Sequence, residues 1–185
     1  IGLACAERLQ KEGATICCIQ RSHSNLFDSF EFDLLKEEEC SNSIKAIIKK
    51  YGRIDVLINN AGMMKESSMQ DTTFETWNQT LALNLTAPFL LSKLAMPFLI
   101  KSKGCIVNIG SIEGLGANPN HAAYCASKAG LHGLTRATAI DHGKDGVRCN
   151  AVAPGWIDTE LNEEFIKSMP NPKHFRENIG NIHPL

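Results

Sequence analysis

Short runs of mainly apolar residues recur along the chain, and they constrain its fold more than any other feature. They cover residues 14–19, 54–58, 105–109 and 147–152. A strand with one face in water alternates apolar and polar side chains, whereas a strand of a parallel sheet is covered on both faces and reads as a nearly continuous apolar run. Longer segments with helical spacing separate these runs. This alternation indicates an α/β fold built on a parallel sheet.

The helical segments complete this expected architecture. Helices are predicted over residues 1–12, 34–51, 72–99, with an adjustment near Pro88, and 122–141, and a short strand over 30–32. We therefore expect one domain, a doubly wound parallel sheet of Rossmann type, over residues 1–185. Ligands of such folds bind outside the carboxyl ends of the strands.

The composition argues against several classes of protein. The 185 residues carry a formal charge of −1, without a basic cluster that could hold a phosphate backbone. No apolar run approaches the roughly 20 residues of a membrane helix. The seven cysteines are odd in number and form no Cys-x-x-Cys pair, and the histidines lack metal-ligand spacing. We expect reduced cysteines, a cytoplasmic protein, no metal, no membrane and no nucleic acid.

Both ends of the chain suggest that the fold is incomplete there. The helical pattern already runs at Ile1, without a capping residue before it. The other end follows a polar stretch that contains Pro170 and Pro172. We expect the chain to be a segment of a longer protein, truncated at both ends.

Five motifs along the chain share an order and spacing that resemble the short-chain dehydrogenase/reductase family over nearly its whole length. A Tyr-x-x-x-Lys pair alone is a weak signal, but the five together are specific. They are Asn59-Asn60-Ala61-Gly62, Asn84 in Leu83-Asn84-Leu85, Ser111 after a strand, Tyr124-Cys125-Ala126-Ser127-Lys128, and Pro154-Gly155-Trp156-Ile157-Asp158-Thr159. The resemblance implies an enzyme that transfers a hydride between NAD(P) and a secondary alcohol or ketone.

The catalytic chemistry follows from the residue types. Tyr124 and Lys128 are four residues apart on a predicted helix, so they share a face, and a nearby ammonium favours the phenolate. We therefore expect Lys128 to lower the pKa of Tyr124 and make it the acid/base. Ser111, at a strand end, can hold the substrate oxygen. The resemblance implies that Asn84 binds a water that links the lysine to solvent.

The resemblance also implies the cofactor contacts. Gly2 would be the last glycine of a phosphate-binding loop, whose preceding strand would lie at the centre of the sheet. A glycine at 62 permits a tight turn and a close approach of the cofactor. The remaining expected contacts are Asp33 and Leu34 to adenine, Asn59 and Ala61 beside Gly62, Tyr124 and Lys128 at the nicotinamide ribose, and Ile157 and Thr159 at the carboxamide.

The end of the second strand decides between NADP and NAD. An acidic residue there would hydrogen-bond the ribose hydroxyls and repel a 2′-phosphate, but this chain has Gln20 followed by Arg21. A guanidinium suits a phosphate. The sequence therefore favours NADP, although relatives with arginine at this second position also use NAD.

The substrate stays open. Residues 160–185 correspond to the variable lid over the substrate, with Phe165, Met169, His174 and Phe175 among charged residues. Two interpretations stay open for Glu113, Asn118 and His121. They face the mouth of the pocket, or they are polar simply because they lie in a surface loop. A small secondary alcohol and its ketone are favoured, with a 3-oxoacyl thioester reductase as the alternative. Two alternatives that are not active enzymes also stay open. One is a catalytically silent nucleotide-binding scaffold, and the other is an inactive truncated product.

Two helices carry more apolar residues than one sheet contact requires. They are the segments 72–99 and 122–141, with Leu81, Leu85, Phe89, Leu131 and Leu134. The resemblance implies that these helices form the interface between subunits. We expect a homodimer or homotetramer.

Overall fold

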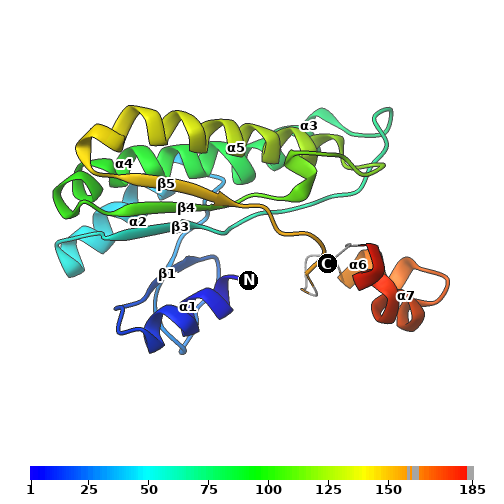
Figure 1. The fold of residues 1–185 in the computed structure, drawn as a ribbon, viewed down its shortest axis with the longest axis horizontal. Helices are drawn as coiled ribbons and strands as arrows, with labels where there is room; N and C mark the ends of the chain where they lie inside the picture. The colour runs from blue at the N-terminus through cyan, green and yellow to red at the C-terminus, as the bar shows by residue number, and fades with distance from the viewer. Residues whose placement is uncertain (158, 160–162, 183–185) are drawn as a thin grey trace.

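The computed structural model describes residues 1–157, 159 and 163–182, and it alternates strands with helices in the predicted manner (Figure 1). The strands are β1 (Cys17–Gln20), β2 (Asp28–Glu31), β3 (Val56–Asn59), β4 (Cys105–Ile109) and β5 (Arg148–Val152). The α-helices are α1 (Gly2–Lys11), α2 (Glu37–Tyr51), α3 (Phe74–Leu81), α4 (Ala87–Ser102), α5 (Ala122–His142), α6 (Glu163–Ser168) and α7 (Pro172–Asn178). Short turns of other helix types are the π-helix η1 (Ala82–Thr86) and the 3-10 helices η2 (Ile112–Gly114), η3 (Gly143–Asp145) and η5 (Ile179–Ile182).

Every strand pair is parallel, as the apolar runs predicted. β1 pairs with β2, and β4 lies between β3 and β5. In the described residues these are two separate sheets, since β1 and β3 are not hydrogen-bonded to each other. Helices α3, α4 and α5 lie over one face of the three-stranded sheet, and α1 lies on the other side (Figure 1). The α/β architecture is therefore confirmed.

The core forms where α2 and α4 pack on the three-stranded sheet. Leu99 and Ile106 are fully buried there, together with Cys40 of α2. Ile44 and Leu91 belong to the same cluster. The apolar side chains that made β3 and β4 recognisable thus hold the helices over them. The carboxyl ends of the strands remain available for a site.

The predicted helix over 72–99 is one helical segment with a π turn in it. α3, η1 and α4 follow each other without a break from Phe74 to Ser102. Pro88 is the second residue of α4, directly after the π turn, and it has no N–H to donate back to the carbonyls of that turn. The expected adjustment is therefore the π turn just before it, which carries Asn84.

This segment is also long and apolar enough to cross a membrane by length and composition, so the prediction that none approaches that length was wrong. About 44% of its apolar window is buried inside the protein. A core helix of a soluble protein passes the same test. Within the chain, this segment packs against α2 and α5.

Local hydrogen bonds explain the other differences from the predicted boundaries. α2 begins at Glu37 rather than at 34, because the side chain of Asp33 accepts from the Leu35 N–H at 3.1 Å and the Asp33 carbonyl accepts from the Lys36 N–H at 3.0 Å. Such turns compete with a helix. The predicted lid region contains α6 and α7, which the sequence pattern did not separate, while residues 160–162 and 183–185 of that region lie outside the described residues.

Candidate active site

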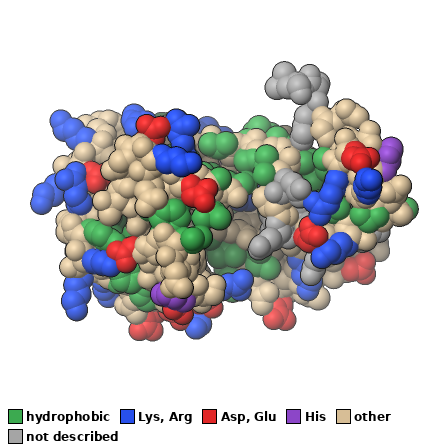
Figure 2. All heavy atoms as spheres, turned by 90° about the horizontal axis from the view of Figure 1, so that it is seen from below, with side chains coloured by type: hydrophobic (Ala, Val, Ile, Leu, Met, Phe, Trp, Pro, Cys, Tyr) green, Lys and Arg blue, Asp and Glu red, His purple; other side chains and the backbone are tan. Residues whose placement is uncertain are grey.

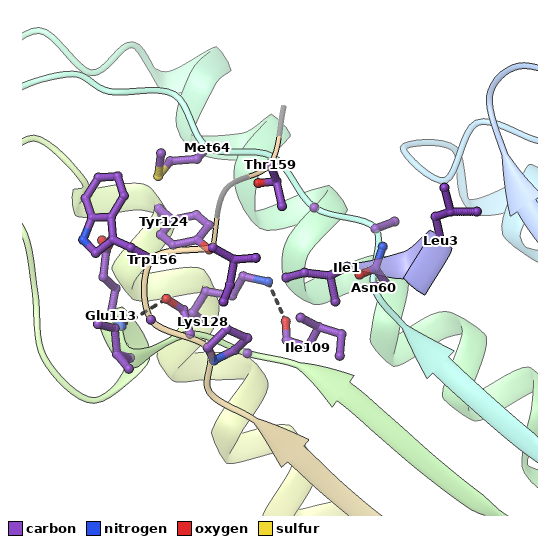
Figure 3. Close-up of a pocket in the computed structure, with 18 residues that line it drawn as sticks. Ile1, Leu3, Asn60, Met64, Ile109, Glu113, Tyr124, Lys128, Trp156 and Thr159 are labelled. Atoms are coloured by element: carbon purple, nitrogen blue, oxygen red, sulfur yellow. Dashed lines mark hydrogen bonds between the residues drawn. The ribbon is translucent and has the colours of Figure 1, made fainter. Parts of the chain in front are cut away.

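A cavity of about 610 Å³ opens at the carboxyl ends of the three-stranded sheet (Figure 3). Figure 2 shows a hollow near the middle of one face of the molecule, with hydrophobic side chains around it. Of the predicted residues, the cavity wall contains Ser111, Tyr124, Lys128, Ala61, Gly62, Ile157 and Thr159. Segments far apart in the sequence therefore meet where the fold predicts a ligand.

Tyr124 and Lys128 lie on one face of α5, as their spacing predicted, and both are buried. The Lys128 Nζ donates to the carbonyl oxygen of Ile109 at 2.7 Å. This carbonyl is at the last residue of β4. The same Nζ lies 5.6 Å from the centre of the Tyr124 ring. The lysine is thus tied to the end of a strand and placed over the aromatic ring.

The expected pKa shift of Tyr124 is contradicted. Burial raises the pKa of the Tyr124 phenol, a hydrogen bond with Ser111 opposes that effect, and the Glu113 carboxylate adds to it. Burial also lowers the pKa of Lys128 to about 8. The prediction failed because desolvation disfavours both charged forms, while the ammonium is turned to the Ile109 carbonyl. In this state Tyr124 is a protonated phenol at neutral pH.

Ser111 lies two residues after β4 and begins the turn η2. Its Oγ accepts from the Glu113 N–H at 3.1 Å, which caps that turn. The same side chain hydrogen-bonds Tyr124. Ser111 and Tyr124 therefore present their hydroxyl groups together in the cavity wall.

Asn84 is fully buried but does not line the cavity. Its Nδ2 donates to the Met63 carbonyl at 2.9 Å and to Ser127 Oγ at 3.0 Å, and its Oδ1 accepts from the Met63 N–H at 2.8 Å. Ser127 in turn donates to the Tyr124 carbonyl at 2.7 Å. Both amide hydrogens of Asn84 are bonded to protein groups. In this structure the side chain therefore links the segment after β3 to α5. Ser127 has a part here that its place within the Tyr-x-x-x-Lys motif could have suggested.

Two glycines lie close to this arrangement, and a side chain at Gly2 would require Asn60 to move. A Cβ at Gly62 would come within 3.3 Å of Asn84 Oδ1 and 3.6 Å of Lys128 Nζ. A Cβ at Gly2 would lie 2.6 Å from Asn60 Nδ2. Gly2 stands between Ile1 and Leu3, which line the cavity. Both positions allow close approach of backbone at the cavity edge.

The other predicted cofactor residues lie away from the cavity wall. Asn59 is buried and donates to Asn108 Oδ1 at 2.8 Å. Leu34 belongs to the hydrophobic core, and Asp33 holds the turn before α2. Arg21 is exposed in the bend after β1. The structure thus brings together the predicted catalytic and nicotinamide positions, but none of these four residues lines their cavity.

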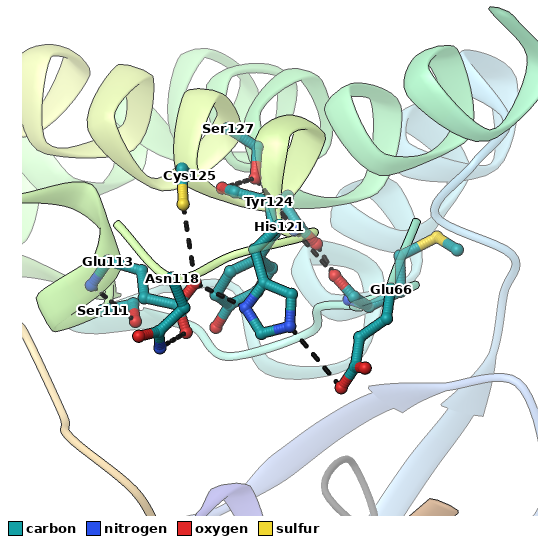
Figure 4. Close-up of polar contacts among 10 residues, drawn as sticks. Glu66, Ser111, Glu113, Asn118, His121, Tyr124, Cys125 and Ser127 are labelled. Carbon is teal, nitrogen blue, oxygen red and sulfur yellow. Dashed lines mark hydrogen bonds and ion pairs between the residues drawn. The ribbon is translucent and has the colours of Figure 1, made fainter. Parts of the chain in front are cut away.

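Two polar residues between Ser111 and Tyr124, Glu113 and His121, are buried, and the half-buried Asn118 contacts Glu113 (Figure 4). The Nδ1 of His121 lies 2.7 Å from the Glu113 carboxylate, and its Nε2 lies 3.5 Å from Glu66. The His121 ring packs edge-on against Tyr124, with centroids 6.2 Å apart. Sequence reasoning left Glu113, Asn118 and His121 undecided, because polar loop residues look alike whether exposed or buried. Glu113 also lines the cavity.

All seven cysteines are free. Among residues 1–157, 159 and 163–182, no three His, Cys, Asp or Glu side chains are placed to hold one ion together.

Residues 1–170 match the family model described as short chain dehydrogenase. A meso-2,3-butanediol dehydrogenase of Serratia marcescens is 44% identical over 134 residues, which cover 72% of this chain and 53% of that protein. The 3-oxoacyl-[acyl-carrier-protein] reductase FabG of Thermotoga maritima is 33% identical over 179 residues, which cover 89% of this chain and 73% of that protein. The chain therefore spans about half the length of the first relative and more of the second.

Solved structures share the fold across nearly the whole chain. The ligand-free aldohexose dehydrogenase of Thermoplasma acidophilum superposes with a TM-score of 0.90 at 32% identity, covering 98% of this chain and 72% of that one. A dehydrogenase designated Cj0485 superposes with a TM-score of 0.92 at 30% identity, covering 100% of this chain and 75% of that one.

Proposed function

The chain belongs to the short-chain dehydrogenase/reductase family, and on this basis we propose that the protein transfers a hydride between NAD(P) and a secondary alcohol or ketone. One observation carries the proposal. Ser111, Tyr124 and Lys128, from a strand end and a helix, line a single cavity at the carboxyl ends of the strands. A catalytically silent scaffold would not need these three side chains together.

In this proposal Tyr124 exchanges the proton with the substrate oxygen. The raised pKa of its phenol suits the reductive direction, in which a protonated group gives its proton to the developing alkoxide. Ser111, hydrogen-bonded to Tyr124, holds the same oxygen in place. Oxidation requires Tyr124 to lose its proton first, so that direction is expected to gain from alkaline pH.

The cavity wall fits a nicotinamide cofactor. Gly62 leaves room for close approach beside Lys128 Nζ, since a Cβ there would lie 3.6 Å from that nitrogen. We propose that Lys128 and Tyr124 hold the nicotinamide ribose, that Ala61, Gly62, Ile157 and Thr159 contact the nicotinamide part, and that Gly2, Asp33, Leu34 and Asn59 belong to the rest of the cofactor site. When bound, the nicotinamide gives or accepts the hydride.

We propose NADP over NAD. The support is Arg21, an exposed guanidinium just after β1, with neutral Gln20 before it. A guanidinium can bind a phosphate through two hydrogen bonds. NAD is the alternative cofactor.

We propose a small secondary alcohol and its ketone as the substrate pair. The relatives named above include a dehydrogenase of a diol and a reductase of a 3-oxoacyl thioester, so the thioester reaction is kept as the second candidate. Residues 160–185 are proposed as the substrate lid. Its support is the edge-on packing of Phe175 in α7 against Trp156 of the cavity wall, with centroids 5.9 Å apart.

We also propose a homodimer or homotetramer in the cytoplasm. Phe89 of α4 is 46% exposed, and Leu81, Leu85 and Leu134 are half-buried, which supports a contact through these helices. Leu131 contributes nothing to that argument because it is buried within the chain itself. The free cysteines suit a reducing compartment.

The experiment is a screen of small ketones and alcohols with each cofactor, using the full-length protein and following the absorbance of the reduced nicotinamide. Turnover by the wild type that Tyr124→Phe abolishes supports the proposal. Cofactor binding without turnover of any ketone or alcohol would instead favour the silent scaffold.

A further inference from the structure

Among the described residues, the wall of the catalytic cavity contains one carboxylate that hydride transfer does not require. Glu113 lines the cavity beside Ser111, Tyr124 and Trp156 (Figure 3), and it is only 9% exposed. It lies in the single turn η2, two residues after Ser111. A buried carboxylate costs stability unless hydrogen bonds compensate it. Its presence in the wall therefore calls for a reason.

Three side chains hold the Glu113 carboxylate in one position (Figure 4). With its proton on Nδ1, His121 donates to Oε2 at 2.7 Å, and Cys125 Sγ donates to the same oxygen at 3.5 Å. Asn118 Nδ2 donates to Oε1 at 3.0 Å. His121 is itself held on its other side by Glu66 at 3.5 Å. The acceptor is therefore fixed before any ligand arrives.

The carboxylate has acceptor capacity beyond these contacts. An ionised carboxylate has about four lone-pair sites and no donor. Within the described part of the chain, two donors reach Oε2 and one reaches Oε1. Oε1 can therefore accept one further hydrogen bond. Because Glu113 is part of the cavity wall, a ligand in the cavity can supply that donor.

The place of Glu113 relative to Ser111 indicates where that donor must be on the substrate. The Glu113 N–H donates to Ser111 Oγ at 3.1 Å, so one turn carries both side chains. Ser111 and Tyr124, which hydrogen-bond each other, mark where the reacting oxygen binds in the proposed function. A group on the next carbon of the substrate would then lie toward Glu113. A hydroxyl group can donate there, whereas a carbonyl oxygen would be repelled.

We propose that Glu113 accepts a hydrogen bond from a hydroxyl group on the carbon next to the reacting one, which makes the enzyme selective for α-hydroxyketones and the vicinal diols formed from them. This inference rests on the proposed function and names its substrate class. A hydroxyl suits the site better than an ammonium, because the Lys128 amine shares the cavity wall. The 3-oxoacyl thioester is disfavoured, since the carbon between its two carbonyl groups carries no hydroxyl that could donate to Glu113. The second hydroxyl itself is unchanged by the reaction.

The test compares ketones of the same size in the reductive direction. Hydroxyacetone and butanone differ only in a hydroxyl against a methyl group, and aminoacetone carries an ammonium there. The wild type should reduce hydroxyacetone with a kcat/KM at least roughly tenfold above that for butanone, as expected for a hydrogen bond to a charged group. Glu113→Gln should lower kcat/KM for hydroxyacetone more than for butanone, so that most of that preference is lost. Glu75→Gln, an exposed change on α3, should alter neither ratio.

The outcomes distinguish failure of the proposed function from failure of the role proposed for Glu113. Reduction of none of the ketones by the wild type overturns the proposed function. Reduction without a preference for hydroxyacetone overturns only the assignment to Glu113, and so does a preference for aminoacetone or for an acetoacetyl thioester. Equal loss for both ketones in Glu113→Gln would make Glu113 a positioning residue for Ser111. If that variant does not fold, the wild-type comparison still decides, together with Glu113→Asp, whose shorter carboxylate should weaken the preference.

Discussion

The Asn84 side chain bonds both backbone polar groups of Met63. Its Nδ2 donates to the Met63 carbonyl oxygen at 2.9 Å, and its Oδ1 accepts from the Met63 N–H at 2.8 Å. The side chain comes from the π turn between α3 and α4, and the backbone segment follows β3. This two-point contact fixes the loop that contains Gly62 at the cavity edge. A third bond to Ser127 extends the same contact to α5.

The first prediction concerns this contact. Asn84→Ala should lower the free energy of unfolding by about 2 kcal/mol or more, because it removes three hydrogen bonds and leaves partly buried backbone groups of Met63 without partners. Urea titration measures the change. Asn78→Ala, an exposed position on α3, is the control and should stay within about 0.5 kcal/mol. Equal stabilities of Asn84→Ala and wild type would show that the contact is dispensable.

The second prediction concerns the packing of β4 against α5. A Cβ at Gly110 would lie 2.1 Å from His132 Nε2, so Gly110→Ala should destabilise the protein by about 1–3 kcal/mol. Adding His132→Ala should recover at least about 1 kcal/mol, measured as a coupling energy in a double-mutant cycle. Gly133→Ala is the matched control, since the nearest atom to its Cβ is 4.0 Å away. Additive effects of the two changes would contradict the predicted clash.

The third prediction concerns pH. The pKa of Lys128 is about 8 in the folded chain against an ordinary value of 10.5, so the cost of burying its charge is fully present below pH 8. As pH rises from about 8 to 10.5, the folded state loses its proton first and gains relative stability. The free energy of unfolding of the wild type minus that of Lys128→Met should therefore rise by about 3 kcal/mol across this window.

The difference between the two proteins is the quantity to measure, because it cancels the contributions of the other ionisable groups. Urea titrations at both ends of the window give it directly. A difference that stays constant with pH would mean that Lys128 keeps its ordinary pKa in the folded chain.

The fourth prediction concerns cofactor choice. If Arg21 binds the 2′-phosphate of NADP, Arg21→Ala in the full-length protein should raise the KM for NADP by roughly tenfold or more and leave that for NAD nearly unchanged. Arg53→Ala removes an exposed arginine that pairs with Asp55, and it should change neither constant. Equal effects of Arg21→Ala on both cofactors would remove the basis for proposing NADP.

The sequence predicted the elements whose pattern reflects their burial. β4 was predicted with its observed bounds and α5 to within one residue, because the apolar run and the helical spacing coincide with what the core covers. The start of α2 was missed, since Asp33 holds a turn through hydrogen bonds that leave no periodic signal. An adjustment near Pro88 was predicted, but its form as a π turn was not, because the apolar spacing continues through it.

The sequence predicted where the candidate site lies, but it did not predict the direction of the pKa shift of Tyr124. Ser111, Tyr124 and Lys128 meet because strand ends and helix faces follow from the pattern. The direction of the Tyr124 pKa shift was wrong, because it depends on how deeply tertiary packing buries the phenol. Glu113 stayed undecided for the same reason, since spacing alone does not tell a buried loop residue from an exposed one.

The most direct test of the central claim is the turnover of Tyr124→Phe in the full-length protein, measured with its cofactor affinity. The change keeps the ring that packs against His121 and removes the hydroxyl that hydrogen-bonds Ser111. Turnover should fall by roughly 10² to 10⁴-fold, the usual loss of a general acid/base, while the Kd for cofactor rises by roughly tenfold at most, because Lys128 still holds the ribose. Near-normal turnover would contradict the assignment of Tyr124 as the proton donor.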